Sequence, residues 1–187
     1  MLKNNFFSIP VFKEDFMKRK SSVNNLCLIA ISVAFICVIA PFVIPIGTVP
    51  FSFADFIILL LSSVLGKKAG SIATILYILI GGCGLPVFSG FSGGVGKLLG
   101  PTGGFIIGFI PMAYINGMGK NKKNSYLYSF LAVLCDYIIG TIYFMFVTRI
   151  ELFKSLLICV VPFIIPDIIK IFFAKYLSLK LKKGFGI

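Results

Sequence analysis

Apolar residues form six runs that are separated by short polar or basic segments. The runs cover residues 26–46, 53–66, 69–85, 103–118, 126–148 and 155–181. A hydrocarbon core of about 30 Å needs roughly 20 apolar residues in a helix, so the second and fourth runs are short enough to be half-helices. We predict an all-α, polytopic membrane protein with six transmembrane helices in a single domain, residues 26–187.

Prolines interrupt the first and the last run. Pro41 and Pro45 predict a kink or an irregular last turn at the end of the first helix. Pro162 and Pro166 divide the last run. This predicts either one kinked helix or an apolar re-entrant piece followed by a helix that starts near Pro166. The pattern does not distinguish these two structures.

A glycine-rich segment, residues 86–102, lies between the third and fourth runs. Glycine permits positive φ angles and lets the backbone approach a ligand closely. A loop of this length in a small protein is more often functional than passive. We therefore expect a long loop that contributes to a ligand site. It has no GxxxxGK[ST] pattern, which argues against phosphate binding.

Composition and charge define the surroundings of the chain. Hydrophobic residues make up 58% of the 187 positions and charged residues only 13%, which is too apolar for a soluble domain. The formal net charge is +12. The basic residues lie between the apolar runs and not on one surface, so we expect membrane lipid and not nucleic acid as the partner.

The basic residues also predict an orientation. With the N-terminus inside, the inner segments hold fourteen lysines and arginines, including the basic tail of residues 1–25 and Lys175, and the outer segments hold three. Cytoplasmic segments carry this excess in membrane proteins. We predict a multi-pass protein of the plasma membrane with both termini in the cytoplasm and the glycine-rich loop outside.

Four ionisable residues lie within the apolar runs, namely Asp55, Asp136, Asp167 and Lys170. A charge at the bilayer centre costs roughly 2.5–3.5 kcal/mol on insertion scales, so each is a candidate functional group. Asp167 and Lys170 share a helix face, either as a structural ion pair or beside a polar cavity. Asp55 is near the outer end of its run and open to solvation. Asp136 is expected to meet a polar group of a neighbouring helix or to serve the fold, and not to bind a ligand.

Other chemistry has little support. The chain has no histidine, and its five cysteines have no CxxC spacing, so we expect no metal, no bound cofactor and no catalytic residue. Asp136 and Asp167 are conceivable as the carboxylate pair of an intramembrane enzyme, but neither lies in a GxGD motif. Ala30 and Ala34 form a small-xxx-small pair that lets another helix approach closely, most simply for internal packing.

Four motifs in order along the chain resemble the BioY family, the biotin-specific substrate-binding (S) components of energy-coupling-factor (ECF) transporters. They read TVPFS at 48–52, LPVFSG at 85–90, GPTGGF at 100–105 and PFIIPDIIK at 162–170. The resemblance runs from about residue 26 to residue 180. It implies a six-helix fold, cytoplasmic termini and a ligand cavity near the outer face.

The resemblance also implies partners and site residues. Ala30 and Ala34 match the stripe by which S components dock on the transmembrane T subunit, which works with two ABC-type ATPase subunits that use ATP. Asp167 and Lys170 match the biotin-binding pair. Ser92 stands in the ligand-covering loop, where some relatives are expected to have Asn or Ser.

Biotin chemistry agrees with this assignment. Asp167 can accept from the ureido N–H groups, and Lys170 can donate to the ureido carbonyl or to the carboxylate; the sequence leaves both open. The apolar remainder would pack against aromatic residues, for which we expect Phe51, Phe88 and Phe91, with Tyr77 as a further candidate.

One departure and two alternatives remain. Relatives usually read PFTLQT at the first corner, whereas this chain has Ala54 and Asp55 in place of Gln-Thr, which leaves the ligand contact there open. An S component for another vitamin is the nearest alternative. A secondary transporter that works without an ATPase is the other, although we find no inverted repeat.

Overall fold

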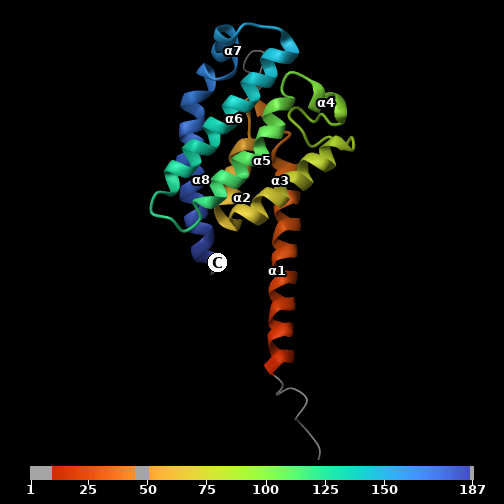
Figure 1. The fold of residues 1–187 in the computed structure, drawn as a ribbon, viewed down its shortest axis with the longest axis vertical. Coiled ribbons are helices and arrows are strands. Elements are labelled where there is room, and N and C mark those ends of the chain that lie inside the picture. Colours follow the sequence, from red (N-terminus) through yellow and green to blue (C-terminus); the bar gives the residue numbers. More distant parts are fainter. Residues whose placement is uncertain (1–9, 45–50, 186–187) are drawn as a thin grey trace, which may run out of the picture.

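The computed structural model describes residues 10–44 and 51–185 of the chain. They form a helical bundle (Figure 1), with helix α1 extending past the others at one end. The elements are α1 (Pro10–Ile39), β1 (Val43–Ile44), β2 (Phe51–Ser52), α2 (Ala54–Leu65), α3 (Lys67–Gly82), α4 (Val95–Leu99), α5 (Gly103–Met118), α6 (Ser125–Thr148), α7 (Leu152–Cys159), the 3₁₀ turn η1 (Val161–Phe163) and α8 (Ile164–Phe185).

Helix α1 differs from the prediction at both ends. It begins at Pro10 and not near Leu26, so the described part of the basic tail continues the helix. Proline suits the first helical position because it needs no N–H partner there. The helix ends at Ile39, just before Pro41, because the residue that precedes a proline avoids helical angles. Pro45 lies outside the described residues.

Helix boundaries in the middle of the chain follow the hydrophobic pattern. Gly66 has a φ of 90° and separates α2 from α3, and only glycine adopts this angle without strain. The fourth predicted helix, residues 103–118, coincides with α5. The glycine-rich segment contains a helix that we did not predict, the short α4.

Helices α5 and α6 pack closely because glycines line their interface. A Cβ atom at Gly104 would overlap Tyr143, one at Gly108 would overlap Asp136, and one at Gly140 would overlap Phe105. Small residues four apart let two helix backbones approach each other in this way.

The last apolar run is broken, as one of the two alternatives predicted. Helix α7 ends at Cys159, a 3₁₀ turn contains Pro162, and α8 starts at Ile164, two residues before Pro166. Asp167 therefore lies in the first turn of α8, where a negative charge is favoured by the helix dipole.

The two ends of the bundle differ in charge. Figure 1 places the α2–α3 turn, the α5–α6 turn and the C-terminus at one end, and α4 and α7 at the other. The two turns at the first end carry Lys67, Lys68, Lys120, Lys122 and Lys123. Lys175, which we assigned to an inner segment, is instead buried within the bundle and donates to Ser63 Oγ.

Among residues 10–44 and 51–185, two stretches are long and apolar enough to cross a membrane, Ser125–Thr148 and Leu152–Gly184. Three shorter apolar helices accompany them, Val23–Ile39, Ala54–Leu65 and Gly103–Met118. The mostly helical class is therefore confirmed, whereas the number of six crossings stays a prediction.

Candidate functional site

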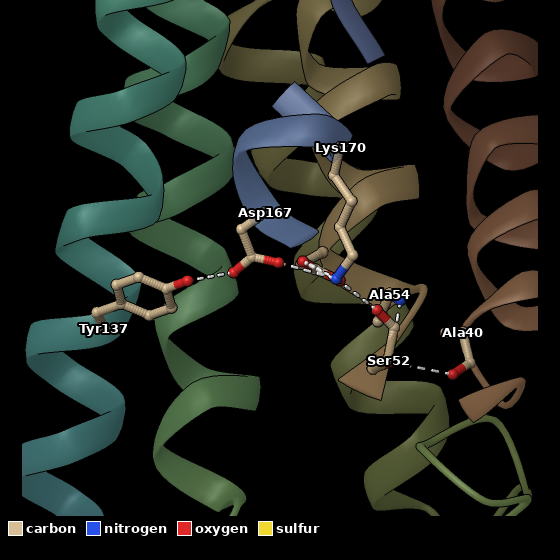
Figure 2. Close-up of polar contacts among 7 residues, drawn as sticks. Ala40, Ser52, Ala54, Tyr137, Asp167 and Lys170 are labelled. Carbon is tan, nitrogen blue, oxygen red and sulfur yellow. Dashed lines mark hydrogen bonds and ion pairs between the residues drawn. The ribbon is translucent and has the colours of Figure 1, made fainter. Parts of the chain in front are cut away.

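Lys170 is the centre of a buried polar cluster at the end of the bundle that carries α4 and α7. Its ammonium donates to Asp55 Oδ2 at 2.7 Å and to the backbone oxygen of Ser52 at 2.9 Å. Asp167 Oδ1 lies 3.0 Å from the same nitrogen. The side chains of Lys170 and Asp167 are buried, with 8% and 9% exposed, and that of Asp55 is 15% exposed. The cluster thus joins β2, α2 and α8 (Figure 2).

Each member of the cluster is positioned by local structure. Ser52 Oγ accepts from the Ala54 N–H at 3.0 Å, which begins α2, and donates to the Ala40 oxygen at 3.4 Å. Tyr137 of α6 donates its hydroxyl hydrogen to Asp167 Oδ2, as Figure 2 shows. Helix α8 therefore presents Asp167 between Tyr137 and Lys170.

The cluster retains hydrogen-bonding capacity. An ammonium has three N–H donors, and Lys170 uses two of them, for Ser52 and Asp55. Asp167 Oδ1 is close to Lys170 but has no hydrogen-bond partner. The third donor faces Asp167 Oδ1 across the 3.0 Å ion pair. Because a carboxylate oxygen has two lone pairs, Oδ1 can still accept a hydrogen bond from a ligand.

A cavity opens beside this cluster. Its volume is about 80 Å³, several times the roughly 10–15 Å³ that a single water needs, so it is more than a packing defect. The lining combines the polar cluster with an apolar wall and is made of Ser52, Asp55, Ser89, Thr102, Phe105, Ile106, Phe109, Asp136, Tyr137, Cys159, Phe163, Asp167 and Lys170. Such a surface suits an apolar ligand that has a few polar groups.

Three of the predicted site residues meet in the cluster. Asp167 and Lys170 both line the cavity, so the structure brings the predicted pair to a common cavity. Phe51 contacts Lys170 from outside that lining: its ring centroid lies 3.7 Å from the Lys170 nitrogen, a cation–π contact.

The predicted loop residues do not line this cavity. Phe88 is fully buried against Tyr77, with ring centroids 5.5 Å apart, and anchors the loop. Phe91 is 61% exposed and packs on Phe42. Ser92 donates its hydroxyl hydrogen to the Ser89 oxygen. The loop reaches the cavity through Ser89, and Thr102 lines it just before α5; ligand contact by Phe88, Phe91 and Ser92 stays a prediction.

Several cavity residues were not recognised as site residues from the sequence. Asp55 is not solvated, as we had allowed, but pairs with Lys170. Asp136 lines the cavity, whereas we had expected it to meet a polar group of a neighbouring helix or to serve the fold. Tyr137 and the aromatic residues of α5 gave no signal, because an aromatic residue in an apolar helix usually packs in the core. Asp136 next to Tyr137 in an otherwise apolar helix was the available hint.

The predicted docking pair lies on the surface. Ala30 and Ala34 are both exposed on α1, next to the exposed Ile31 and Phe35. The interpretation of this pair as internal packing is therefore wrong. A small-residue stripe with large apolar neighbours remains open to another helix.

Comparison with known proteins identifies a family and relatives that resemble this chain. The sequence profile of the BioY family matches residues 17–186. The probable biotin transporter BioY of Pyrococcus horikoshii is 42% identical over 144 residues, which cover 76% of this chain and 86% of that protein. The biotin transporter BioY of Thermotoga maritima is also 42% identical over 144 residues, with 75% and 85% covered.

A solved structure agrees with these relatives. The crystal structure of the S-component for biotin from an ECF-type ABC transporter matches with a TM-score of 0.81 and 28% identity. The match covers 88% of this chain and 93% of that chain. Family profile, close relatives and fold all lead to one assignment: the chain belongs to the BioY family.

Proposed function

We propose that this chain captures biotin at the outer face of the plasma membrane, as the S component of an ATP-driven ECF importer. The family is one of transporters and not of enzymes. The observation that carries the proposal is the Asp167–Lys170 pair beside the cavity. It offers a carboxylate oxygen that can accept a further hydrogen bond and an ammonium group that a ligand carbonyl can share with Asp167.

The chemistry of biotin fits this arrangement. Its ureido group carries N–H donors and a carbonyl acceptor side by side, so one donor and one acceptor on neighbouring side chains can bind it together. The apolar bicycle and the valeryl chain fit against Phe105, Phe109 and Phe163. Charge-assisted hydrogen bonds to Asp167 and Lys170 supply specificity once the ligand has displaced water from the site.

The partner subunits follow from the same proposal. Ala30 and Ala34 provide an exposed stripe on α1 for the T subunit, and two ATPase subunits would hydrolyse ATP to drive release inward. The positive-inside rule places the lysine-rich turns and both termini in the cytoplasm. The cavity is lined by Ser89 and Thr102 of loop 86–102. Since α4 of this loop lies at the opposite end of the bundle, the cavity would face outward with the loop as its cover.

Calorimetry on the purified chain in detergent tests the ligand. Biotin and desthiobiotin should bind, and thiamine and riboflavin should not. Asp167→Asn and Lys170→Met should each weaken biotin binding by about 10- to 100-fold, as expected for hydrogen bonds to charged groups. Lys175→Met is the matched control, because it removes another buried lysine of α8 that does not line the cavity.

The outcomes separate the parts of the proposal. Preference for another vitamin would overturn biotin as the substrate. Unchanged binding in both site variants would mean that the ligand lies elsewhere. Lys170→Met also leaves Asp55 and Asp167 without their cation, so a thermal unfolding measurement must show that the variant is folded. Uptake into cells with and without the T and ATPase subunits tests whether transport requires ATP.

A further inference from the structure

Asp136 is the carboxylate of the cavity that lacks an ion-pair partner. It lies on α6, is 6% exposed and lines the cavity with Asp55 and Asp167. Lys170 pairs with Asp55 and with Asp167, and no ion pair to Asp136 occurs within residues 10–44 and 51–185. Asp136 Oδ1 is buried and has no hydrogen-bond partner.

A buried carboxylate without a partner is unfavourable, because it has lost its water and gained nothing in exchange. The neighbouring helix accommodates it all the same. A Cβ atom at Gly108 of α5 would overlap Asp136 Oδ1, so glycine at this position leaves room for the carboxyl group. An unfavourable polar group that lines a cavity is expected where a ligand supplies the missing hydrogen bond.

We propose that Asp136 is a further binding residue, which accepts a hydrogen bond from one ureido N–H of biotin. This inference rests on the proposed function. The two N–H groups of a cyclic urea point away from each other, so one carboxylate cannot accept both in good geometry. Asp167 on α8 offers Oδ1 for one of them, and Asp136 on α6 faces the same cavity from another helix.

Asp136→Leu provides the test, because it removes the carboxylate and keeps the branching of the side chain. We expect biotin affinity to fall by about 10- to 100-fold, as for the loss of a charge-assisted hydrogen bond. The thermal unfolding temperature of the ligand-free protein should stay the same or rise, since a buried polar group without a partner has been removed. A structural role for Asp136 predicts the opposite change in stability.

Thr141→Val is the matched control. Thr141 is also on α6, is 3% exposed, and its Oγ1 is likewise buried without a partner, but it does not line the cavity. This variant should bind biotin like the unmodified chain. A loss of affinity as large as that of Asp136→Leu would show that α6 tolerates no change, and would overturn a specific role for Asp136.

Biotin analogues identify the contact. Two analogues, each methylated at one ureido nitrogen, should bind more weakly than biotin to the unmodified chain. The analogue that lacks the N–H facing Asp136 should bind equally to Asp136→Leu and to the unmodified chain, because the interaction is already lost. Unchanged biotin affinity in Asp136→Leu overturns the inference and leaves the proposed function intact, whereas an unmodified chain that binds no biotin overturns the proposed function itself.

Discussion

At the scale of single residues, the site depends on how Lys170 is held. Its ammonium contacts oxygens of Ser52, Asp55 and Asp167, which come from β2, α2 and α8. Three elements therefore fix one charge before any ligand arrives. Such preorganisation lowers the entropic cost of binding, because the side chain does not have to be ordered by the ligand. The same contacts explain how Asp55 fits into the site.

Tyr137→Phe tests the orientation of Asp167. Tyr137 donates to Asp167 Oδ2 and leaves Oδ1 toward Lys170. Loss of this hydrogen bond to a charged group should weaken biotin binding by about tenfold, as measured by calorimetry. Tyr128→Phe, on the same helix but in contact with Lys122, should leave affinity unchanged. Equal affinity of Tyr137→Phe and the unmodified chain would show that Asp167 needs no support.

At the scale of elements, the half of the bundle away from the cavity is joined by a second polar cluster. The amide nitrogen of Asn116 on α5 donates to the Leu59 oxygen at 2.7 Å and to Ser62 Oγ at 2.7 Å on α2. Its Oδ1 accepts from Ser129 of α6 at 2.6 Å. Asn116 is fully buried. Three helices therefore meet through one side chain, which keeps their register.

Asn116→Ala should destabilise the bundle without changing the ligand site. The change removes the hydrogen bonds that join α5 to α2 and α6, which we expect to lower the free energy of unfolding by about 1–3 kcal/mol. The measurement is thermal unfolding in detergent together with biotin calorimetry. Asn124→Ala, at an exposed position without a capping hydrogen bond, serves as the control. A variant that unfolds like the unmodified chain would contradict this role.

At the scale of the whole molecule, the cavity and the proposed docking surface are separate. The cavity lies among β2, α2, α5, α6 and α8, and Ala30 and Ala34 lie on the exposed face of α1. Helix α1 contributes no residue to the cavity lining. Binding of biotin and docking of the T subunit are therefore expected to be separable by mutation.

Ala34→Phe tests this separation. A bulky side chain on the stripe should block close approach of a T-subunit helix. We expect loss of co-purification with the T and ATPase subunits, and biotin affinity within about twofold of the unmodified chain, because surface changes rarely propagate. Ile138→Phe, an equally exposed apolar site on α6, should still assemble. Assembly of Ala34→Phe would place the docking surface elsewhere.

The sequence alone was sufficient for four of the helices and for locating the Asp167–Lys170 pair. Hydrophobic runs predicted α2, α3, α5 and α6, because a membrane helix must be apolar along its whole length. Asp167 and Lys170 were recognisable because charges in apolar runs are costly and rare. The family profile and the relatives confirm the family resemblance. The motifs were specific because they occur together and in order along the chain.

Tertiary structure alone decided which residues share the cavity. Asp167 on α8 is far in sequence from Asp55 on α2 and from Asp136 and Tyr137 on α6. Only the packing of these helices brings the four residues to one cavity. Phe88 and Phe105 are equally aromatic, yet the fold buries one as an anchor and turns the other toward the cavity. Hydrophobic periodicity predicts that a helix face is shielded from water. It does not predict whether lipid, protein or ligand covers that face, since all three are apolar surroundings.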